Sequence, residues 1–285
     1  MTVAIVTDSG SELTADQMAE NGIAQVPLTV SFGGEGFLSP DEIPPEEFWR
    51  RVLEPDCPAV HTAAPSAGQF KAAFEKAFSD GVDSVVYVGL TDTLSATLRS
   101  AEMARSMLPD REIHIVDSQS ASMGIGALAI IAAQMAAAGS SGVEIAAHLA
   151  ETREFVDLFV TLDTLEFLRK GGRISAAQAA IGGLLSIKPI ITVVDGVVVV
   201  VDRPRTRGKA RERVLELLTQ RPVRELHILY SPPAVVDDFK EELLARMPGP
   251  LPSVVTTQII GPVIGTHVGP GSLGAVLIAE SKPIR

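Results

Sequence analysis

The chain has 285 residues, of which 46% are apolar and 21% are charged, and this composition excludes a disordered or collagen-like protein. The 35 acidic residues outnumber the 24 basic residues, and the net charge of -11 disfavours nucleic acid and anionic lipid surfaces as partners. A single cysteine, Cys57, excludes an intrachain disulfide and a cysteine-rich zinc site. At ~150 residues per domain, the length predicts about two domains.

No segment has the pattern of a targeting or membrane element. The N-terminus lacks a basic region, and Asp8 interrupts its first apolar run, so we expect no secretory signal. The uncharged stretch 118–143 is long enough to span a bilayer, but it consists mostly of alanine, glycine and serine. We therefore expect a buried core helix there, and a cytoplasmic protein without stable membrane insertion.

Strand-like and helix-like segments alternate along the first half of the chain. The segment 24–32 alternates like a strand, and Pro27 within it favours the edge of a sheet. Thr14 with Gln17 and Ser66 with Gln69 form capping boxes that predict the start of two helices. Short apolar runs typical of buried strands lie at 3–6, 84–90 and 112–116. The alternation predicts a parallel sheet with helices on both faces, an α/β domain over residues 1–160.

The second half has a different pattern. Two β-branched runs flank Asp195 and Gly196, which predicts a β-hairpin. Helices are predicted near 175–185, 207–219 and 235–246, and further strands near 156–162, 225–230, 254–259 and 274–279. A hairpin combined with helices predicts a mixed sheet, and so an α+β domain over residues 161–285.

Hydroxyl side chains are concentrated in loops at the expected carboxyl ends of the first-half strands. Four loops carry them, at 7–11, 61–66, 91–97 and 117–120. A single serine or threonine there is most simply a helix N-cap. Since ligands of open α/β sheets bind at these strand ends, four such loops favour an anion or carboxylate site built from neutral donors.

Sequence motifs for common enzyme classes are weak or missing. The segment Gly124 to Ala129 matches a dinucleotide fingerprint, but it does not follow a strand directly, so close helix packing is the better interpretation. The chain has no nucleophile elbow around a serine. Its five histidines, at 61, 114, 148, 227 and 267, are too dispersed for a metal site.

Three basic features have both a functional and a structural interpretation. The glycine-rich segment 261–271 is predicted to form a loop between two strands, and His267 within it is either a ligand group or a turn histidine. Arg173 follows a glycine pair and either binds an anion or forms a surface ion pair. The segment 203–213 holds six basic residues and one acidic residue, which indicates either a solvated helix start or a docking patch for an acidic partner.

Taken in order, these motifs are similar to those of the DegV family of fatty-acid-binding proteins, over nearly the whole chain, about 3–280. The first-half motifs are V-T-D-S at 6–9, T-x-x-P-S at 62–66, L-S-x-T at 94–97 and D-S at 117–118. The second-half motifs are K-G-G-R-I-S at 170–175, I-K-P at 187–189 and G-T-H-x-G-P-G at 265–271. The K-G-G-R-I-S and G-T-H-x-G-P-G elements, in this order, are the specific part of the resemblance.

The resemblance implies an α/β domain and an α+β domain with a long-chain fatty acid in an apolar tunnel between them. Its carboxylate is held by Thr62 and Ser95, and a separate ATP-dependent fatty acid kinase converts it to acyl phosphate. Arg173 and His267 assist that transfer. The implied protein is a carrier with no turnover of its own, no cofactor and no metal.

Two positions depart from the family pattern, and two other functions remain open. Ala63 stands where serine is common and Ala96 where glycine is common, so we expect one donor fewer and a narrower carboxylate corner. One alternative is a stand-alone phosphotransferase or acyl hydrolase that uses Ser95, Arg173 and His267. The other is a lipid store or sensor without a kinase partner.

Overall fold

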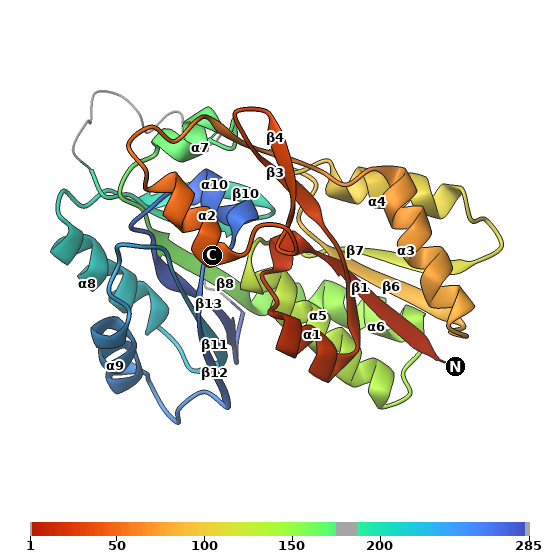
Figure 1. The fold of residues 1–285 in the computed structure, drawn as a ribbon. Helices are drawn as coiled ribbons and strands as arrows, with labels where there is room; N and C mark the ends of the chain where they lie inside the picture. The colour runs from red at the N-terminus through yellow and green to blue at the C-terminus, as the bar shows by residue number, and fades with distance from the viewer. Residues whose placement is uncertain (1, 175–186, 283–285) are drawn as a thin grey trace.

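The fold was analysed in a computed structural model that describes residues 2–174 and 187–282. Figure 1 shows a four-stranded sheet on one side of the molecule and a six-stranded sheet on the other, with helices between and around them. The helix predicted near 175–185 lies outside the described residues.

The four-stranded sheet is parallel, as predicted, and has the order β2-β1-β6-β7. Its strands are β1 (Val3–Asp8), β2 (Ile23–Val26), β6 (Ser84–Gly89) and β7 (Glu112–Asp117). Helices α3 (Ala67–Ser79) and α4 (Thr97–Ser106) cover one face, and α5 (Met123–Ala137) and α6 (Gly142–Thr152) cover the other. Alternation explains the two layers, because Ile5 faces the α5 side and Val6 faces the α3 side. The prediction of an α/β sheet is confirmed.

Local sequence signals place several helix ends correctly. The capping box at Thr14 opens α1 (Ala15–Asn21), and the one at Ser66 opens α3. The glycines of the apparent dinucleotide fingerprint lie inside α5, where a Cβ on Gly126 would come 2.7 Å from the Ser11 carbonyl oxygen. Close packing, not a cofactor loop, therefore accounts for this motif.

The six-stranded sheet is mixed and has the order β10-β9-β8-β13-β11-β12. Only β11 and β12 pair in parallel; the other neighbours are antiparallel. Its strands are β8 (Val156–Thr161), β9 (Ile190–Val194), β10 (Val197–Asp202), β11 (Val223–Tyr230), β12 (Val254–Ile259) and β13 (Leu273–Ala279). Asp195 and Gly196 turn the β9–β10 hairpin with φ of 50° and 80°, as their dipeptide predicts.

The two faces of this sheet have different neighbours. Helices α8 (Arg207–Leu218) and α9 (Asp237–Arg246) pack with its outer face in one hydrophobic cluster. The inner face meets α5, which contacts β8 and β13, so α5 lies between the two large sheets (Figure 1). The inner cluster is shared by the two halves of the chain, since Leu158 and Leu229 belong to it together with Ile5 and Ile125. The boundary at residue 160 stays a prediction, and β8 crosses it.

A third, small sheet was not predicted. Pro27 divides the expected strand 24–32 into β2 and β3 (Leu28–Phe32), which belong to different sheets. Strand β3 pairs with β4 (Glu35–Ser39) and β5 (Val60–Ala63), and β2 does form an edge of the four-stranded sheet. The small sheet and α2 (Pro45–Val52) reach across to contact α10 (Pro262–Val268) in the second half.

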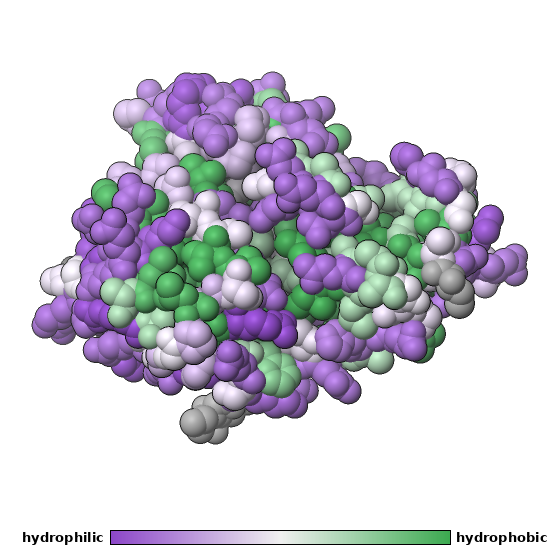
Figure 2. Space-filling view, turned by 90° about the horizontal axis from the view of Figure 1, so that it is seen from below, coloured by the Kyte–Doolittle hydropathy of each residue, from purple (hydrophilic) through white to green (hydrophobic). Residues whose placement is uncertain are grey.

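The surface is mixed in character. Figure 2 shows one face, on which apolar patches are interrupted by hydrophilic side chains. Among residues 2–174 and 187–282, no helix combines the length and apolar character needed to cross a membrane.

Candidate functional site

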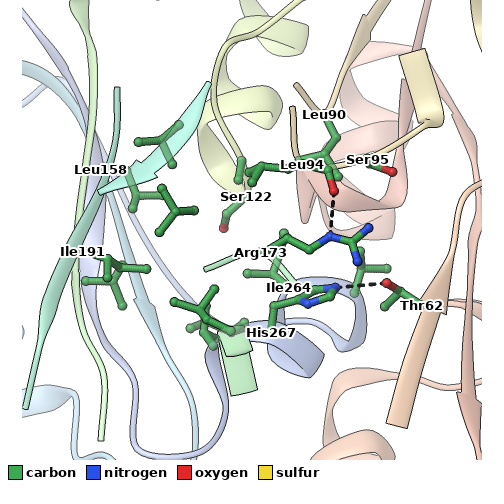
Figure 3. Close-up of a pocket in the computed structure, with 18 of the residues that line it drawn as sticks. Thr62, Leu90, Leu94, Ser95, Ser122, Leu158, Arg173, Ile191, Ile264 and His267 are labelled. Carbon is green, nitrogen blue, oxygen red and sulfur yellow. Dashed lines mark hydrogen bonds between the residues drawn. The ribbon is translucent and has the colours of Figure 1, made fainter. Parts of the chain in front are cut away.

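A largely apolar cavity lies between the inner face of the six-stranded sheet and the loops of the first half (Figure 3). We call it the tunnel. Five of its lining residues are polar: Thr62, Ser95, Ser122, Arg173 and His267. The apolar lining is Leu28, Leu90, Leu94, Ala121, Leu158, Val160, Leu168, Ile191, Val193, Val198, Leu229, Ile260, Val263, Ile264 and Val268.

The structure brings together the four residues singled out from the sequence. Thr62 lies on β5, Ser95 in the loop after β6, Arg173 just after α7 (Glu166–Lys170), and His267 in the last turn of α10. In Figure 3 their polar groups lie at one end of the tunnel, while Leu158 and Ile191 line the other end. The tunnel is therefore apolar along most of its length and polar at one end, an arrangement that suits a ligand with an apolar chain and a polar head group.

His267 does not lie in a loop, and the expectation of a glycine-rich loop there was wrong. Residues 262–268 form α10, because Pro262 occupies the first helical turn, where proline is favoured, and Gly265 lets the helix approach α2. A Cβ on Gly265 would come 2.7 Å from the ring of Phe48. Packing against Phe48 and Trp49 thus selects a helix where glycine content alone favours a loop.

The imidazole of His267 is neutral at physiological pH. Burial, and then the positive charge of Arg173, lower its pKa to about 4. Its Nε2 lies 3.0 Å from the Thr62 Oγ1, whereas its buried Nδ1 has no hydrogen-bond partner among the described residues. Gly171 backs the ring so closely that a Cβ there would come 2.2 Å from Nδ1. This environment favours a neutral, hydrogen-bonding imidazole over a cation.

Arg173 is held by carbonyl oxygens and not by a carboxylate. Its Nε donates to the Leu94 carbonyl at 2.9 Å, and its Nη1 donates to the Gly171 carbonyl at 2.6 Å. The surface ion pair that the sequence left open is not formed with any described residue. The guanidinium charge at the polar end therefore remains available to an anion.

Ser95 is buried and takes part in a local turn. Its Oγ lies 2.7 Å from the Thr97 Oγ1 and accepts from the Thr97 N–H at 3.3 Å. The hydroxyl has two lone pairs and one proton, so it can still donate to a ligand if Thr97 supplies the proton of their shared bond.

Most of the other hydroxyls in the four loops serve the fold. Thr7 donates to the Val88 carbonyl at 2.8 Å, and Ser9 accepts from the Leu28 N–H at 2.9 Å. The Ser118 hydroxyl donates to the Ser120 carbonyl at 3.3 Å and accepts from the Ser120 N–H at 3.1 Å. The prediction that all four loops converge on one anion site was therefore wrong for the loops at 7–11 and 117–120.

Asp8 is a supporting residue whose role the sequence did not reveal. Its buried carboxyl accepts from the Tyr87 hydroxyl at 2.6 Å, the Leu90 N–H at 2.9 Å and the Gly10 N–H at 2.8 Å. Burial raises its pKa although these hydrogen bonds lower it. Asp8 thereby fixes the start of the loop that carries Leu94 and Ser95 into the tunnel wall.

The basic segment 203–213 leads into α8, and several of its arginines form ion pairs within the chain. Arg207 binds Asp163, which also accepts from Lys188 at 3.0 Å, and Arg211 binds Glu242. Partial burial raises the pKa of Asp163, but the bonds from Arg207 and Lys188 outweigh that effect and leave it lowered. Arg205 is exposed and forms no ion pair with a described residue. The helix-start interpretation is confirmed for 207–213, while docking stays a prediction.

The described part of the chain contains no group of three or more His, Cys, Asp or Glu side chains placed to hold a metal ion.

The sequence analysis did not single out Ser122 and Glu12. Ser122 lines the tunnel, and its hydroxyl donates to Glu12 at 2.7 Å. A lone glutamate after a serine-rich loop gives no signal that it will be buried.

Comparison with known proteins agrees with the resemblance seen in the sequence. The profile of the DegV family, described as an uncharacterised protein family, matches residues 2–280. A DegV domain-containing protein of Mycobacterium tuberculosis is 35% identical over 289 residues, covering 99% of both chains.

Two solved structures of DegV family proteins are similar to this chain in fold as well as in sequence. A DegV family protein from Thermus thermophilus, described by its fatty acid binding, has a TM-score of 0.88 and 32% identity, covering 98% of this chain and 100% of its own. DegV of Bacillus subtilis, described as a fatty acid binding protein, has a TM-score of 0.87 and 31% identity, covering 98% and 99%. The profile, the relative and both structures each span nearly the whole chain, and the chain therefore belongs to the DegV family.

Proposed function

We propose that this protein binds a long-chain fatty acid in the tunnel and presents its carboxylate to a separate fatty acid kinase in the cytoplasm. The observation that carries the proposal is the tunnel itself, an apolar channel in which four of the five polar side chains, those of Thr62, Ser95, Arg173 and His267, gather at one end. Two structural neighbours at 31% and 32% identity are described as fatty acid binding, which supports the same ligand class here.

The acyl chain supplies most of the affinity, since burial of each methylene contributes ~0.8 kcal/mol. Thr62 and Ser95 bind the carboxylate through neutral hydroxyl donors, which leave it more nucleophilic than a bidentate arginine would. Arg173 and His267 act on the phosphoryl group as it arrives, one as a fixed charge and the other as a neutral N–H donor. The protein thus positions the reacting group without turnover of its own.

A stand-alone hydrolase is the less favoured function. Ser95 bonds to Thr97, and the hydroxyl within reach of His267 is that of Thr62. A nucleophile and base of the triad type also require a third group that orients the imidazole, but the Nδ1 of His267 has no partner among the described residues. A lipid store without a kinase differs from the proposal only in the coupled assay below.

Mass spectrometry tests the first step. The purified protein, compared under native and denaturing conditions, should carry a mass that corresponds to a long-chain fatty acid. Incubation of the loaded protein with ATP alone should leave the lipid unchanged. Acyl phosphate formed with ATP alone, trapped as a hydroxamate by hydroxylamine, would favour the phosphotransferase instead.

A paired measurement tests the second step. Arg173→Ala and His267→Ala should keep their fatty acid through purification but lose most acyl phosphate formation with a bacterial fatty acid kinase and ATP. Removal of a group that stabilises charge in the reacting state typically costs ~2.7–4 kcal/mol, whereas ground-state binding suffers less. Variants that turn over normally, or that are isolated without lipid, would contradict the transfer role.

A further inference from the structure

Ser122 is the polar residue of the tunnel wall that lies away from the polar end. The other four polar side chains gather at that end, whereas Figure 3 shows Ser122 apart from them, between Leu94 and Leu158. Ser122 is only 1% exposed, and the described lining residues outside the polar end are otherwise aliphatic. A single hydroxyl in an aliphatic wall is a specific feature, because polar groups in such surroundings are costly unless they find partners.

The backbone of Ser122 is held in an unfavourable conformation. Its φ of 57° and ψ of -143° lie outside the regions that residues with a Cβ ordinarily adopt. Ser122 occupies the N-cap position of α5, where a serine hydroxyl usually accepts from the backbone of the first turn, yet it forms no such bond. The strained conformation therefore does not serve to cap the helix. It places the hydroxyl between the tunnel and Glu12 instead.

Glu12 determines the direction of the Ser122 hydroxyl proton. The Ser122 Oγ donates to the Glu12 Oε2 at 2.7 Å, and the Glu12 Oε1 accepts from the Gly261 N–H at 2.6 Å. The Gln258 Nε2 donates to the Glu12 carbonyl at 2.7 Å, which holds the backbone that carries the carboxylate. Since the proton points toward Glu12, the hydroxyl can offer only its lone pairs to the tunnel. The negative carboxylate also polarises the hydroxyl and makes its oxygen a stronger acceptor.

An acceptor in the tunnel wall distinguishes between polar groups on a ligand. A ligand hydroxyl can donate to the Ser122 oxygen, whereas a keto group brings a second acceptor and gains nothing. An ammonium group can also donate, but its charge is expensive to bury in an aliphatic channel. A methylene group is tolerated, because the Ser122 proton is already bonded to Glu12. The ligand class that gains from this wall is therefore an acyl chain with a hydroxyl group.

We propose that Ser122, oriented by Glu12, is a hydroxyl-selective point in the tunnel wall, and that the ligands of this protein include long-chain fatty acids with a hydroxyl group part of the way along the chain. The inference rests on the proposed function for the acyl chain and its carboxylate, and it adds a specificity that neither of them requires. Ser122 contacts the ligand directly. Glu12 acts through Ser122 and is a positioning residue.

A series of closely related ligands tests the selectivity. Calorimetry compares stearic acid, its monohydroxy derivatives with the hydroxyl at successive carbons, and the keto derivative of the tightest isomer. Burial raises the pKa of Glu12 to about 7. The titrations are therefore run at about pH 8.5, where its carboxylate is ionised. One isomer, or neighbouring isomers, should bind at least as tightly as stearic acid. The keto derivative, and isomers whose hydroxyl meets only aliphatic side chains, should bind about tenfold more weakly.

Ser122→Ala should remove this preference. The tightest hydroxy isomer should lose about tenfold in affinity, while stearic acid should bind as before. Ser120→Ala is the matched control, because it removes another buried hydroxyl of the same loop, at a position that is not among the lining residues of the tunnel. The control should keep the wild-type order of ligands. A hydroxy isomer that binds equally well to the wild type and to Ser122→Ala would overturn the proposal.

Glu12→Gln tests the orientation of the hydroxyl. Glutamine keeps an oxygen for the Gly261 N–H and presents its Nε2 donor to Ser122. The Ser122 oxygen then accepts from the glutamine, and its proton points into the tunnel. The keto derivative should gain affinity in this variant and the hydroxy isomer should lose its advantage, a reversal that reduced stability alone does not produce. The same order of ligands in Glu12→Gln as in the wild type would contradict the role of Glu12.

The outcome for stearic acid separates this inference from the proposed function. If no ligand of the series binds, the proposed function fails and the inference fails with it. If stearic acid binds and every hydroxy isomer binds more weakly, in the same order in the wild type and in Ser122→Ala, only the hydroxyl selectivity is contradicted. Should Glu12→Gln not fold, the comparison of Ser122→Ala with Ser120→Ala decides.

Discussion

The side chains of Thr62 and His267 lie 205 positions apart in the chain, yet Oγ1 and Nε2 meet at 3.0 Å. Thr62 belongs to the small antiparallel sheet of the first half, and His267 to α10 of the second. These two polar groups thus satisfy each other across the junction of the halves. A carboxylate that binds there replaces this bond, so the net gain from the head group is smaller than its hydrogen bonds alone suggest.

The first prediction compares the head group with the chain. Thr62→Ala and Ser95→Ala should each weaken fatty acid binding by ~1.5–3 kcal/mol, the range for hydrogen bonds to a charged group. For Thr62 the bond to the ligand replaces the internal bond to His267, so a value near the lower end is expected there. Removal of four methylenes from the ligand should cost ~3 kcal/mol, since the acyl chain dominates. Calorimetry measures both, and equal affinity for a fatty acid and its methyl ester would refute the head-group site.

The second prediction concerns the basic segment. Charge reversal at Arg205, Arg207 and Arg211 should abolish coupling to the kinase and leave lipid binding intact, and added salt should weaken wild-type coupling. Reversal of Arg207 also places like charges beside Asp163. Arg205→Glu alone is therefore the cleaner variant, and it should lower the coupled rate severalfold.

Lys76→Glu on α3 is the control, because it reverses a highly exposed charge on the opposite side of the molecule from α8 (Figure 1), where the exposed ion pair with Asp80 contributes little to stability. It should leave the coupled rate unchanged. Coupling that is independent of salt, or full activity of the triple variant, would leave the segment as a solvated helix start.

The third prediction tests Asp8 as the support of the loop after β6. Asp8→Ala leaves the buried Tyr87 hydroxyl and the N–H groups of Leu90 and Gly10 without their acceptor. The free energy of unfolding, measured with urea, should fall by about 3 kcal/mol or more. Tyr87→Phe removes only one of the three donors and should cost about 1 kcal/mol. An equal loss in both variants would argue against a central role for the carboxyl group.

The fourth prediction uses the close contact behind His267. Gly171→Ala keeps an allowed backbone, but its Cβ would come 2.2 Å from the His267 Nδ1, so the ring must move and its bond to Thr62 must lengthen. We expect a loss of about 1–3 kcal/mol in unfolding free energy and a shifted His267 ring signal in NMR.

Gly208→Ala serves as its control. A Cβ at Gly208, in the first turn of α8, meets nothing within 4 Å, and alanine favours helix. That variant should be neutral or slightly more stable. If both variants behave alike, the predicted clash with His267 does not occur.

Local patterns in the sequence were sufficient to predict a parallel sheet in the first half and a mixed sheet in the second. The dipeptide of Asp195 and Gly196 predicts the hairpin, and short apolar runs predict the buried parallel strands. The split at Pro27 could not be predicted, because the segments on both sides have strand character and only tertiary pairing assigns them to different sheets. Similarly, α10 depends on packing against Phe48 and Trp49, which lie more than 200 residues away in the chain.

The site was predictable only in part, for a related reason. Spacing and residue type indicated hydroxyl-rich loops, but the convergence of Arg173 and His267 with Thr62 came from the resemblance to a family. Burial determines the charge state of His267, and that burial depends on contacts between the halves that no local pattern encodes. The same residue types on an open surface would behave as ordinary titrating groups.

The tunnel lies within the hydrophobic core that the two halves share, so a ligand bound there affects the stability of the whole protein. Its wall residues Leu158 and Leu229 belong to the same hydrophobic cluster as Ile5 and Ile125, so a ligand bound in the tunnel would pack against the core of the whole molecule. Unfilled apolar space costs folding free energy that a bound acyl chain restores. We therefore expect the protein without bound lipid to be less stable, and more readily degraded by cellular proteases, than the protein with lipid bound.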